Sequence, residues 1–464
     1  MRQLFRKRLI LAALTIIIFV LLVPQAILAA APKNIIFYIG DGMASTQRRV
    51  AEEVHKRKLA MNTLPVVGIY TTFSADSIVT DSASAATAMA TGHKTENGVI
   101  SMDAEGEISF ETIAEAAKRL GKSVGLLTTT RLTHATPAAF GTHIESRGDE
   151  NAIAVQYLEG GFEVLMGGGW GNFVPKSTEK SRRWDKRNLL KEFEEKGYQV
   201  LRTRNDLINL QVRKNTRVVG LFTRSHLPYF LDRTANEPDL SEMTRAALKI
   251  LSQNPKGFFL MVEGGRIDHA AHGNSPAAAI GDLLELDNAV KTGLEFGKEN
   301  PSTLILVGGD HETGGMGMGI GGQYFMRPAV IKKVTRSEFG MGYGDVLENP
   351  DQAFAIFKKY TGIEKLSPEE TEAIKLAIKN TKEGRGLQSP NKTYNPSWFA
   401  YTFSRILSQR SRIGWTSYAH TAHPIILTAG GPGSENFMGF YDNTDLCKKM
   451  ASLWGITLKS WKVE

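Results

Sequence analysis

The chain has 464 residues, of which 42% are hydrophobic and 22% charged, a composition of globular proteins that excludes a disordered or fibrous chain. The formal net charge is +8, and removing the four basic residues within the first eight positions leaves +4, which does not indicate a nucleic-acid partner. Cys447 is the single cysteine, so an intrachain disulfide is excluded and a thiol-based site is not expected.

The first 30 residues form a segment of their own. Four basic residues precede an apolar run from Leu9 to Val23, and small residues follow around Ala29 to Ala31. This order is typical of a secretory signal peptide, and the run is short for a membrane-spanning helix. An uncleaved N-terminal anchor is the alternative. We predict an exported protein, periplasmic or secreted, or tethered to the membrane if the segment is retained.

From residue 34 onward, apolar runs that end in glycine or an acid alternate with helix-like stretches. The predicted strands, the first with its turn, are 34–42, 123–130, 163–169, 217–222, 257–265, 302–310 and 423–431. The predicted helices are 108–121, capped by Ser109, then 240–254, and 276–297, which Pro276 opens. Continuous apolar strands that alternate with helices predict an α/β fold, a mostly parallel central sheet with helices on both faces.

Two stretches interrupt this alternation. Residues 170–216 are charged and irregular around a short helix near Lys186 to Lys196. Residues 314–410 open with a glycine-rich run, become lysine-rich and contain a helix near Pro368 to Lys379. We interpret both as insertions in a single catalytic domain over 31–464, the second being a cap or interface module.

Acids follow three of the predicted strands. Asp41, Glu263 and Asp310 each stand where an apolar run ends, and His311 follows the last of them. In open α/β sheets, ligands bind outside the carboxyl ends of the strands. One such acid is compatible with an ordinary turn, but three in the same topological position favour a common site.

Further candidate metal ligands lie in two other segments. If the chain turns helical after Gly265, Asp268 and His272 are separated by one turn and share a face, whereas His269 lies about 100° around the helix. Incidental histidines on a solvated helix are the alternative. His420 precedes a late strand. Together with Asp41, Asp310 and His311 these residues supply enough nitrogen and oxygen ligands for two zinc ions.

The stretch VTDSASAATAMATG, residues 79–92, places Ser82 at the start of a helix made of small residues. A helix N-terminus favours an anion, and small residues allow close packing beneath a site. A serine hydroxyl is a weak nucleophile, and no GxSxG elbow surrounds Ser82, but a metal cluster could lower the pKa of the hydroxyl directly. Arg147 in THIESR is suited to bind phosphate oxygens, although one arginine is a weak signal.

These motifs resemble the alkaline phosphatases, metal-dependent phosphomonoesterases, from Asn34 to about Leu446. The resemblance rests on IGDGM, VTDSASAATA, HATPAAFGTHIESR, VEGGRIDHAAH, GGDHETGG and AHT. It implies an alkaline-phosphatase-like fold with a cap, hydrolysis of small phosphate monoesters through a phosphoserine, and a homodimer to which 314–410 contributes.

The resemblance also implies a role for each site residue. Ser82 would be the nucleophile and Arg147 the phosphate-binding residue, oriented by Asp81. A first zinc would be held by Asp268, His272 and His420, and a second by Asp310, His311 and Asp41. A third ion, normally magnesium, would be held by Asp41, Thr136 and Glu263.

Two positions depart from the best-known bacterial members. His134 and His269 stand where those members have aspartate and lysine, whereas other members have histidine at both positions. In that second group the third site tolerates zinc or cobalt, so the identity of the third ion is open. We expect both histidines to lie beside the substrate, and we do not count His134 as a direct ligand.

Two rival functions are weighed against this one. A phosphodiesterase or sulfatase of the same superfamily would differ at the nucleophile: sulfatases need a Cys/Ser-x-Pro-x-Arg signature, which DSASAAT lacks, and diesterases usually have threonine there. A non-enzymatic phosphate- or metal-binding protein of the cell envelope would be favoured if the serine or any metal ligand were missing. Phosphate release from a simple aryl phosphate separates these possibilities.

Overall fold

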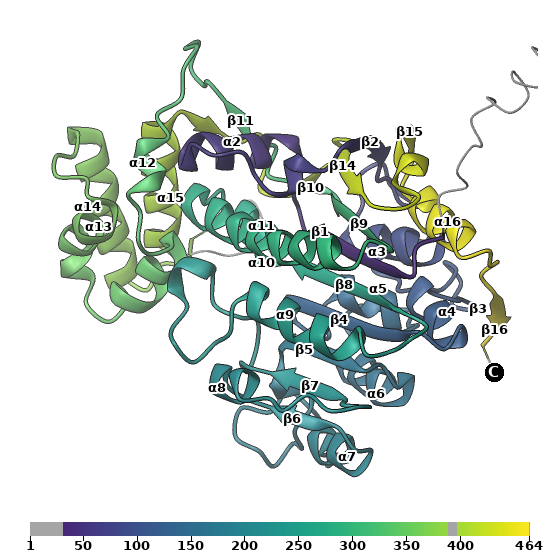
Figure 1. The fold of residues 1–464 in the computed structure, drawn as a ribbon. Helices are drawn as coiled ribbons and strands as arrows, with labels where there is room; N and C mark the ends of the chain where they lie inside the picture. Colours follow the sequence, from purple (N-terminus) through teal and green to yellow (C-terminus); the bar gives the residue numbers. More distant parts are fainter. Residues whose placement is uncertain (1–30, 388–396, 464) are drawn as a thin grey trace, which may run out of the picture.

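The computed structural model describes residues 31–387 and 397–463, and the predicted signal segment lies outside them. A ten-stranded sheet runs through the molecule (Figure 1) in the order β15 (Gly439–Asp442), β2 (Val66–Thr71), β14 (Ile425–Gly430), β9 (Thr303–Gly309), β1 (Asn34–Gly40), β8 (Phe258–Gly264), β4 (Ser123–Arg131), β5 (Val164–Gly168), β7 (Val218–Leu221) and β6 (Gln199–Leu201). Only β14 pairs antiparallel with its neighbours in this sheet, so the predicted mostly parallel α/β fold is confirmed.

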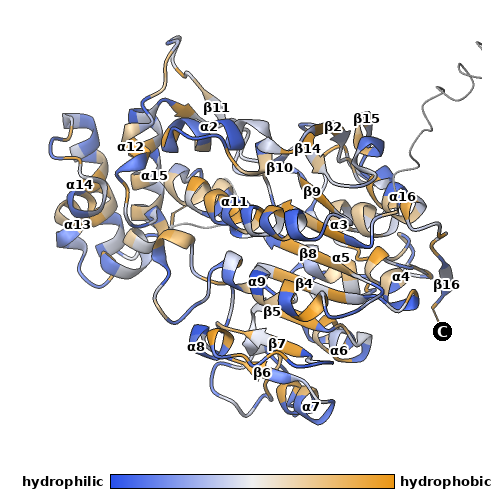
Figure 2. Ribbon diagram, viewed as in Figure 1, coloured by the Kyte–Doolittle hydropathy of each residue, from blue (hydrophilic) through white to orange (hydrophobic). Residues whose placement is uncertain are grey.

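Two hydrophobic cores lie on opposite faces of the sheet. Along β1, Ile36 and Tyr38 belong to one core, while Ile35, Phe37 and Ile39 belong to the other. The first core includes residues of α2 (Ser45–His55), α9 (Leu240–Leu251) and α11 (Pro276–Glu299). The second includes residues of α3 (Ser82–Thr91), α4 (Ile113–Arg119), α5 (Ala135–Gly141), α6 (Glu150–Gly160) and α16 (Thr444–Leu453). Burial on both faces explains the continuous apolar strands, which Figure 2 shows as the most hydrophobic part of the fold.

One predicted helix is wrong at its beginning. Residues 108–121 do not form one helix capped by Ser109, because Ile108–Phe110 is strand β3, paired with β16 (Ser460–Lys462). The helix α4 begins after Thr112, whose hydroxyl accepts from the Glu115 backbone N–H, while the Glu115 carboxylate accepts from the Thr112 N–H. This reciprocal capping box is a stronger start signal than Ser109 offers.

Both proposed insertions contact the rest of the fold. Within 170–216, α7 (Leu189–Glu195) and α8 (Arg204–Ile208) flank β6, which is the last strand of the main sheet. Within 314–410, α12 (Ala329–Lys332), α13 (Ala353–Thr361), α14 (Pro368–Lys382) and most of α15 (Trp398–Ser411) form the helical block at one end of the molecule in Figure 1. Buried residues of this block share a hydrophobic core with α11. The division into one domain with two insertions stays a prediction.

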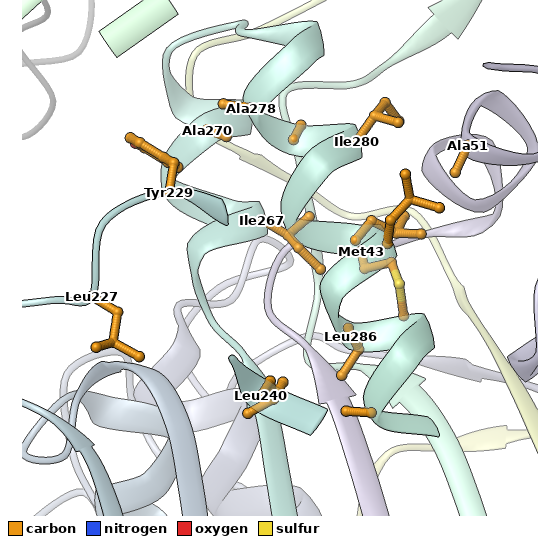
Figure 3. Packing of buried hydrophobic residues seen from close by; sticks show 14 of the residues in the cluster. Met43, Ala51, Leu227, Tyr229, Leu240, Ile267, Ala270, Ala278, Ile280 and Leu286 are labelled. Atoms are coloured by element: carbon orange, nitrogen blue, oxygen red, sulfur yellow. The ribbon is translucent and has the colours of Figure 1, made fainter. Parts of the chain in front are cut away.

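Apolar packing holds the short helix α10 (Arg266–His272) in place. Ile267 and Ala270 of α10 lie in one buried cluster with Ala278 and Ile280 of α11 and with Met43, which follows β1 (Figure 3). This packing fixes the helix that carries Asp268 and His272. In the described ranges, 31–387 and 397–463, no helix has the length and apolar character needed to cross a membrane.

A buried ion pair ties the loop after β7 to α11. Arg233 and Glu285 are 6% and 2% exposed and bond through two contacts, with Arg233 Nη2 2.8 Å from Glu285 Oε2. We expect Arg233→Met to lower the free energy of unfolding by about 3–5 kcal/mol, because it leaves the Glu285 charge buried without its partner. The measurement is urea unfolding followed by circular dichroism.

The control for this prediction is a partly exposed pair. Arg204 and Glu242 are 38% and 19% exposed, so Arg204→Met should change stability by no more than about 1 kcal/mol. Equal destabilisation by the two substitutions would show that burial of Glu285 does not set the cost.

Candidate active site

The strand register brings the three strand-end acids to one edge of the sheet. β1 lies between β8 and β9, parallel to both, and Ile39 pairs with Glu263 while Gly40 pairs with Gly309. Asp41, Glu263 and Asp310 are therefore neighbours, and all three are fully buried. The predicted common site at the carboxyl ends of the strands is present.

The turn after β1 leaves no room for a side chain at Gly42. Its φ is +71°, and a Cβ built there would lie 2.9 Å from the Cα of Asp268. Glycine allows both the left-handed conformation and this close approach. The Gly42 N–H also donates to Asp310 Oδ1 at 3.1 Å. The IGDGM turn thus packs directly against α10 and the end of β9.

Asp268, His272 and His420 form the first of three groups whose ligand atoms lie close enough to share a metal ion. Asp268 Oδ1 is 3.4 Å from His272 Nε2 and 3.5 Å from His420 Nε2. The Nδ1 atoms contact the carbonyl oxygens of Tyr418 at 2.7 Å and Thr80 at 2.8 Å. A proton on each Nδ1 directs both Nε2 lone pairs inward, where they face each other at 3.1 Å. This arrangement suits a cation bound between the two Nε2 atoms.

The second group joins Asp41, Asp268 and His311. His311 Nε2 lies 3.5 Å from Asp41 Oδ1 and 3.3 Å from Asp310 Oδ2, so Asp310 borders the same space. Ser82 Oγ lies 3.2 Å from the same nitrogen. The predicted serine and the predicted second ligand set are therefore in contact.

The third group contains Asp41, His134 and Glu263. Both carboxylate oxygens of Asp41, Nδ1 of His134 and Oε1 of Glu263 are buried without a hydrogen-bond partner in the described part of the chain. Thr136, on α5, is fully buried, and its hydroxyl oxygen likewise has no hydrogen-bond partner among the described residues. The structure thus places Nδ1 of His134, which the sequence did not put among the ligands, with the other candidate ligands of the third ion.

The pKa values of the buried carboxylates indicate that the site lacks enough positive charge to balance these acids. Burial, reinforced by Asp310, raises the pKa of Asp41 well above its ordinary value. Burial also raises the pKa of Glu263 to about 7, and burial with the charge of Asp268 raises the pKa of Asp310 to about 7. Burial acts in the same direction on Asp268, but the neighbouring histidines outweigh it and lower the pKa. Divalent cations would restore the charged form of these acids, so the donor set fits metal ions.

Ser82 and Arg147 form the opposite wall of the site. Asp81 caps α3 by accepting from the Ser84 N–H at 3.0 Å, and all residues of α3 are buried. The other Asp81 carboxylate oxygen accepts from Arg147 Nη1 at 2.9 Å, and Arg147 Nη2 is 3.2 Å from His134 Nε2. The helix of small residues thus packs within the core and presents Ser82 at its N-terminus, as expected for an anion-binding helix end.

These groups open into one hollow of about 660 Å³, which we call the main hollow. Ser82, Arg147, Asp268, His134 and His269 all line it. The volume and the convergence of charged side chains suit a small anionic ligand. Burial, followed by nearby positive charge, lowers the pKa of His134, His269 and His311, which favours the neutral imidazole, the form that binds a metal.

One histidine of the site is absent from the sequence-based predictions. His226 follows β7 and lines the main hollow, and its ring lies 4.4 Å from the ring of His269 and 5.6 Å from that of His134, centre to centre. Its Nδ1 is 3.2 Å from the Arg131 N–H. It lies in the loop beyond the end of β7 at Leu221, so the strand-end pattern that pointed to the acids does not include it.

The fold and the site define an α/β protein in which a serine and an arginine face a buried cluster of candidate metal ligands.

A sequence profile described as alkaline phosphatase matches residues 32–456. Alkaline phosphatase 3 of Bacillus subtilis (strain 168) is 35% identical over 432 residues, 90% of this chain and 88% of that protein. The crystal structure of Thermus thermophilus alkaline phosphatase is 32% identical with a TM-score of 0.82, covering 94% of this chain and 93% of that one. The cold-active alkaline phosphatase of a psychrophilic Shewanella is 31% identical with a TM-score of 0.79, covering 90% and 99%. The chain belongs to the alkaline phosphatase family, whose members are metal-dependent phosphatases.

Proposed function

We propose that this protein is an alkaline phosphatase that hydrolyses small phosphate monoesters through a phosphoserine formed on Ser82. The observation that carries the proposal is the contact of Ser82 Oγ with His311 Nε2 at 3.2 Å, in the same hollow as Arg147. A nucleophile, a guanidinium fork and a set of metal ligands are the parts that phosphoryl transfer needs, because the reaction depends on positioning and charge neutralisation.

Three metal ions belong to the proposal. We assign zinc to Asp268, His272 and His420, and a second zinc to Asp41, Asp310 and His311. The third ion is held by Asp41, Thr136 and Glu263, and is magnesium unless the nitrogen of His134 shifts the preference to zinc or cobalt. When bound, these ions supply Lewis acidity that lowers the pKa of the serine hydroxyl and of water and neutralises charge on the phosphoryl oxygens.

The proposed reaction consists of two successive displacements at phosphorus, and each residue has a separate role in them. Ser82 Oγ attacks phosphorus as the ester P–O bond breaks, and the alcohol leaves with a proton. Water next attacks phosphorus, the Ser82 O–P bond breaks, and inorganic phosphate is released. Arg147 binds two phosphoryl oxygens through its guanidinium fork, and Asp81 holds that fork in place by the 2.9 Å contact.

Arg147 also distinguishes the proposed phosphomonoesterase from the rival function, a phosphodiesterase of the same superfamily. A monoester is a dianion with three free oxygens, two for the fork and one for the proposed metal ions, whereas a diester is a monoanion with two free oxygens and leaves one of these contacts unmade. We expect kcat/KM for p-nitrophenyl phosphate to exceed that for bis-p-nitrophenyl phosphate by about 100-fold, the size of one lost charge-assisted hydrogen bond. Both esters are measured on one metal-loaded preparation. A preference for the diester would favour the rival.

Two broader features stay within the proposal. We propose export on the strength of the N-terminal segment, to a periplasm or outside the cell. We also propose a homodimer with 314–410 in its interface, where Tyr324, Phe325 and Tyr343 expose aromatic side chains. Sedimentation of the mature chain and of a variant with these side chains replaced by serine tests the second point.

A further inference from the structure

A second hollow opens beside the main one. It has a volume of about 560 Å³, and we call it the side hollow. Gly148 and Glu150 line both hollows, so the two are contiguous, while Arg182 and Trp184 line the side hollow. None of the roles assigned above uses the side hollow.

The path from phosphate to side hollow is short. Arg147 lies in the main hollow, Gly148 and Glu150 border both, and Asn151 lies in the side hollow. The four steps from Arg147 to Asn151 cover no more than about 14 Å of backbone even when fully extended, so the side hollow is within reach of an ester bound at Arg147. A nucleoside monophosphate, with its ribose and base, extends further from the phosphate than glycerol phosphate does.

Trp184 differs from the other tryptophans of the chain. It is 72% exposed, and its ring has no aromatic or cationic partner among the described residues. Trp170, Trp454 and Trp461 have such a ring partner, in Arg202, Lys122 and His143, and Trp398 and Trp415 instead donate through Nε1. An unpartnered indole at the rim of a polar hollow is a stacking platform for a planar ring.

The middle of the path is polar. Glu150 accepts from Arg131 through two contacts of 2.7 Å, and Arg182 Nη1 lies 4.0 Å from its carboxylate. Asn151 and Asn172 also line the side hollow, and Asn172 Nδ2 donates to Asn151 Oδ1 at 3.4 Å. Carboxylate and amide groups suit the hydroxyls of a sugar.

We infer that the side hollow is the leaving-group subsite and that it selects nucleoside monophosphates. This inference rests on the proposed function. The phosphate lies at Ser82 and Arg147, the ribose hydroxyls face Glu150, and the base stacks on Trp184. The aromatic platform acts on substrate binding and not on the reacting phosphorus, so its contribution belongs in KM rather than in kcat.

The test compares two esters that differ only in the base. Adenosine 5′-monophosphate and ribose 5-phosphate are assayed on the metal-loaded enzyme, as wild type and as Trp184→Ala. We expect the substitution to lower kcat/KM for the nucleotide, relative to the sugar phosphate, by about 5- to 150-fold, the range of base–aromatic stacking. Trp184→Phe keeps a ring and should restore most of the ratio. Adenosine alone should inhibit ribose 5-phosphate hydrolysis competitively, and more weakly in Trp184→Ala.

Trp461→Ala is the control, because Trp461 is also partly exposed, at 43%, but lies on β16 and lines neither hollow. It should leave the ratio of the two esters as in wild type. An unchanged ratio in Trp184→Ala would overturn the inference while leaving the phosphatase activity intact. A metal-loaded wild type that releases phosphate from neither ester would instead overturn the proposed function.

Discussion

Ser82→Ala is expected to reduce hydrolysis of p-nitrophenyl phosphate by about 100-fold or more, because it removes the group that would form the phosphoserine and leaves only direct attack by water. The side chain is 2% exposed and lines the main hollow, and its hydroxyl lies 3.2 Å from His311 Nε2. Alanine removes the nucleophile and adds no atoms, and it preserves helix α3. The metal content should therefore stay at the wild-type value, as measured by elemental analysis.

The control for Ser82→Ala is another buried serine. Ser404 is also 2% exposed, but it lies on α15 and outside the main hollow, so Ser404→Ala should keep turnover near that of wild type. Near-full turnover in Ser82→Ala, with its metals bound, would show that the nucleophile assignment is wrong. Loss of the metals together with the activity would show that Ser82 is a ligand or a structural residue instead.

Asp268→Asn is expected to have an effect of similar size through the metals. Asp268 belongs to two of the three candidate groups, and its carboxylate is held in the charged form against burial by His272 and His420. Asparagine keeps the shape and removes the charge. Because even partners of a metal ligand change affinity by about 10- to 100-fold, loss of Asp268, a direct ligand of the first zinc that also borders the second site, should empty at least one site and lower turnover by at least that much.

The measurement for Asp268→Asn is zinc bound per chain after dialysis, together with turnover. Asp287→Asn is the matched control, because Asp287 is a buried carboxylate on α11 that bonds Arg57 and the Met61 N–H, away from the site. It should retain the wild-type zinc content. A full zinc complement and full turnover in Asp268→Asn would contradict the proposed ligand sets.

Sequence patterns were sufficient for the features that follow from local periodicity. The apolar runs that end at Asp41, Glu263 and Asp310 mark parallel strands, and parallel strands bring their carboxyl ends together, so the site edge was predictable. The one-turn spacing of Asp268 and His272 likewise became the shared face of α10. These predictions need only strand direction and helical geometry.

Features that depend on packing between distant segments were not predictable. Strand β3 exists because it pairs with β16, more than 300 residues later, and no local signal at Ser109 shows this partner. His226 reaches the main hollow because the loop after β7 extends to the end of β4, where the Arg131 N–H donates to its Nδ1. The position of His134 Nδ1 near Glu263 and the link between the two hollows depend in the same way on loop conformations.

The central claim is that a metal-dependent site hydrolyses phosphate monoesters, and its most direct test is metal analysis of the purified mature chain paired with p-nitrophenyl phosphate turnover before and after chelation. We predict about two zinc ions and a third ion per chain, loss of turnover on chelation, and recovery when metal is returned. The third ion found will show what His134 and His269 select. A chain that binds the metals but never turns over the ester, or one that keeps full turnover when stripped of metal, would contradict the account.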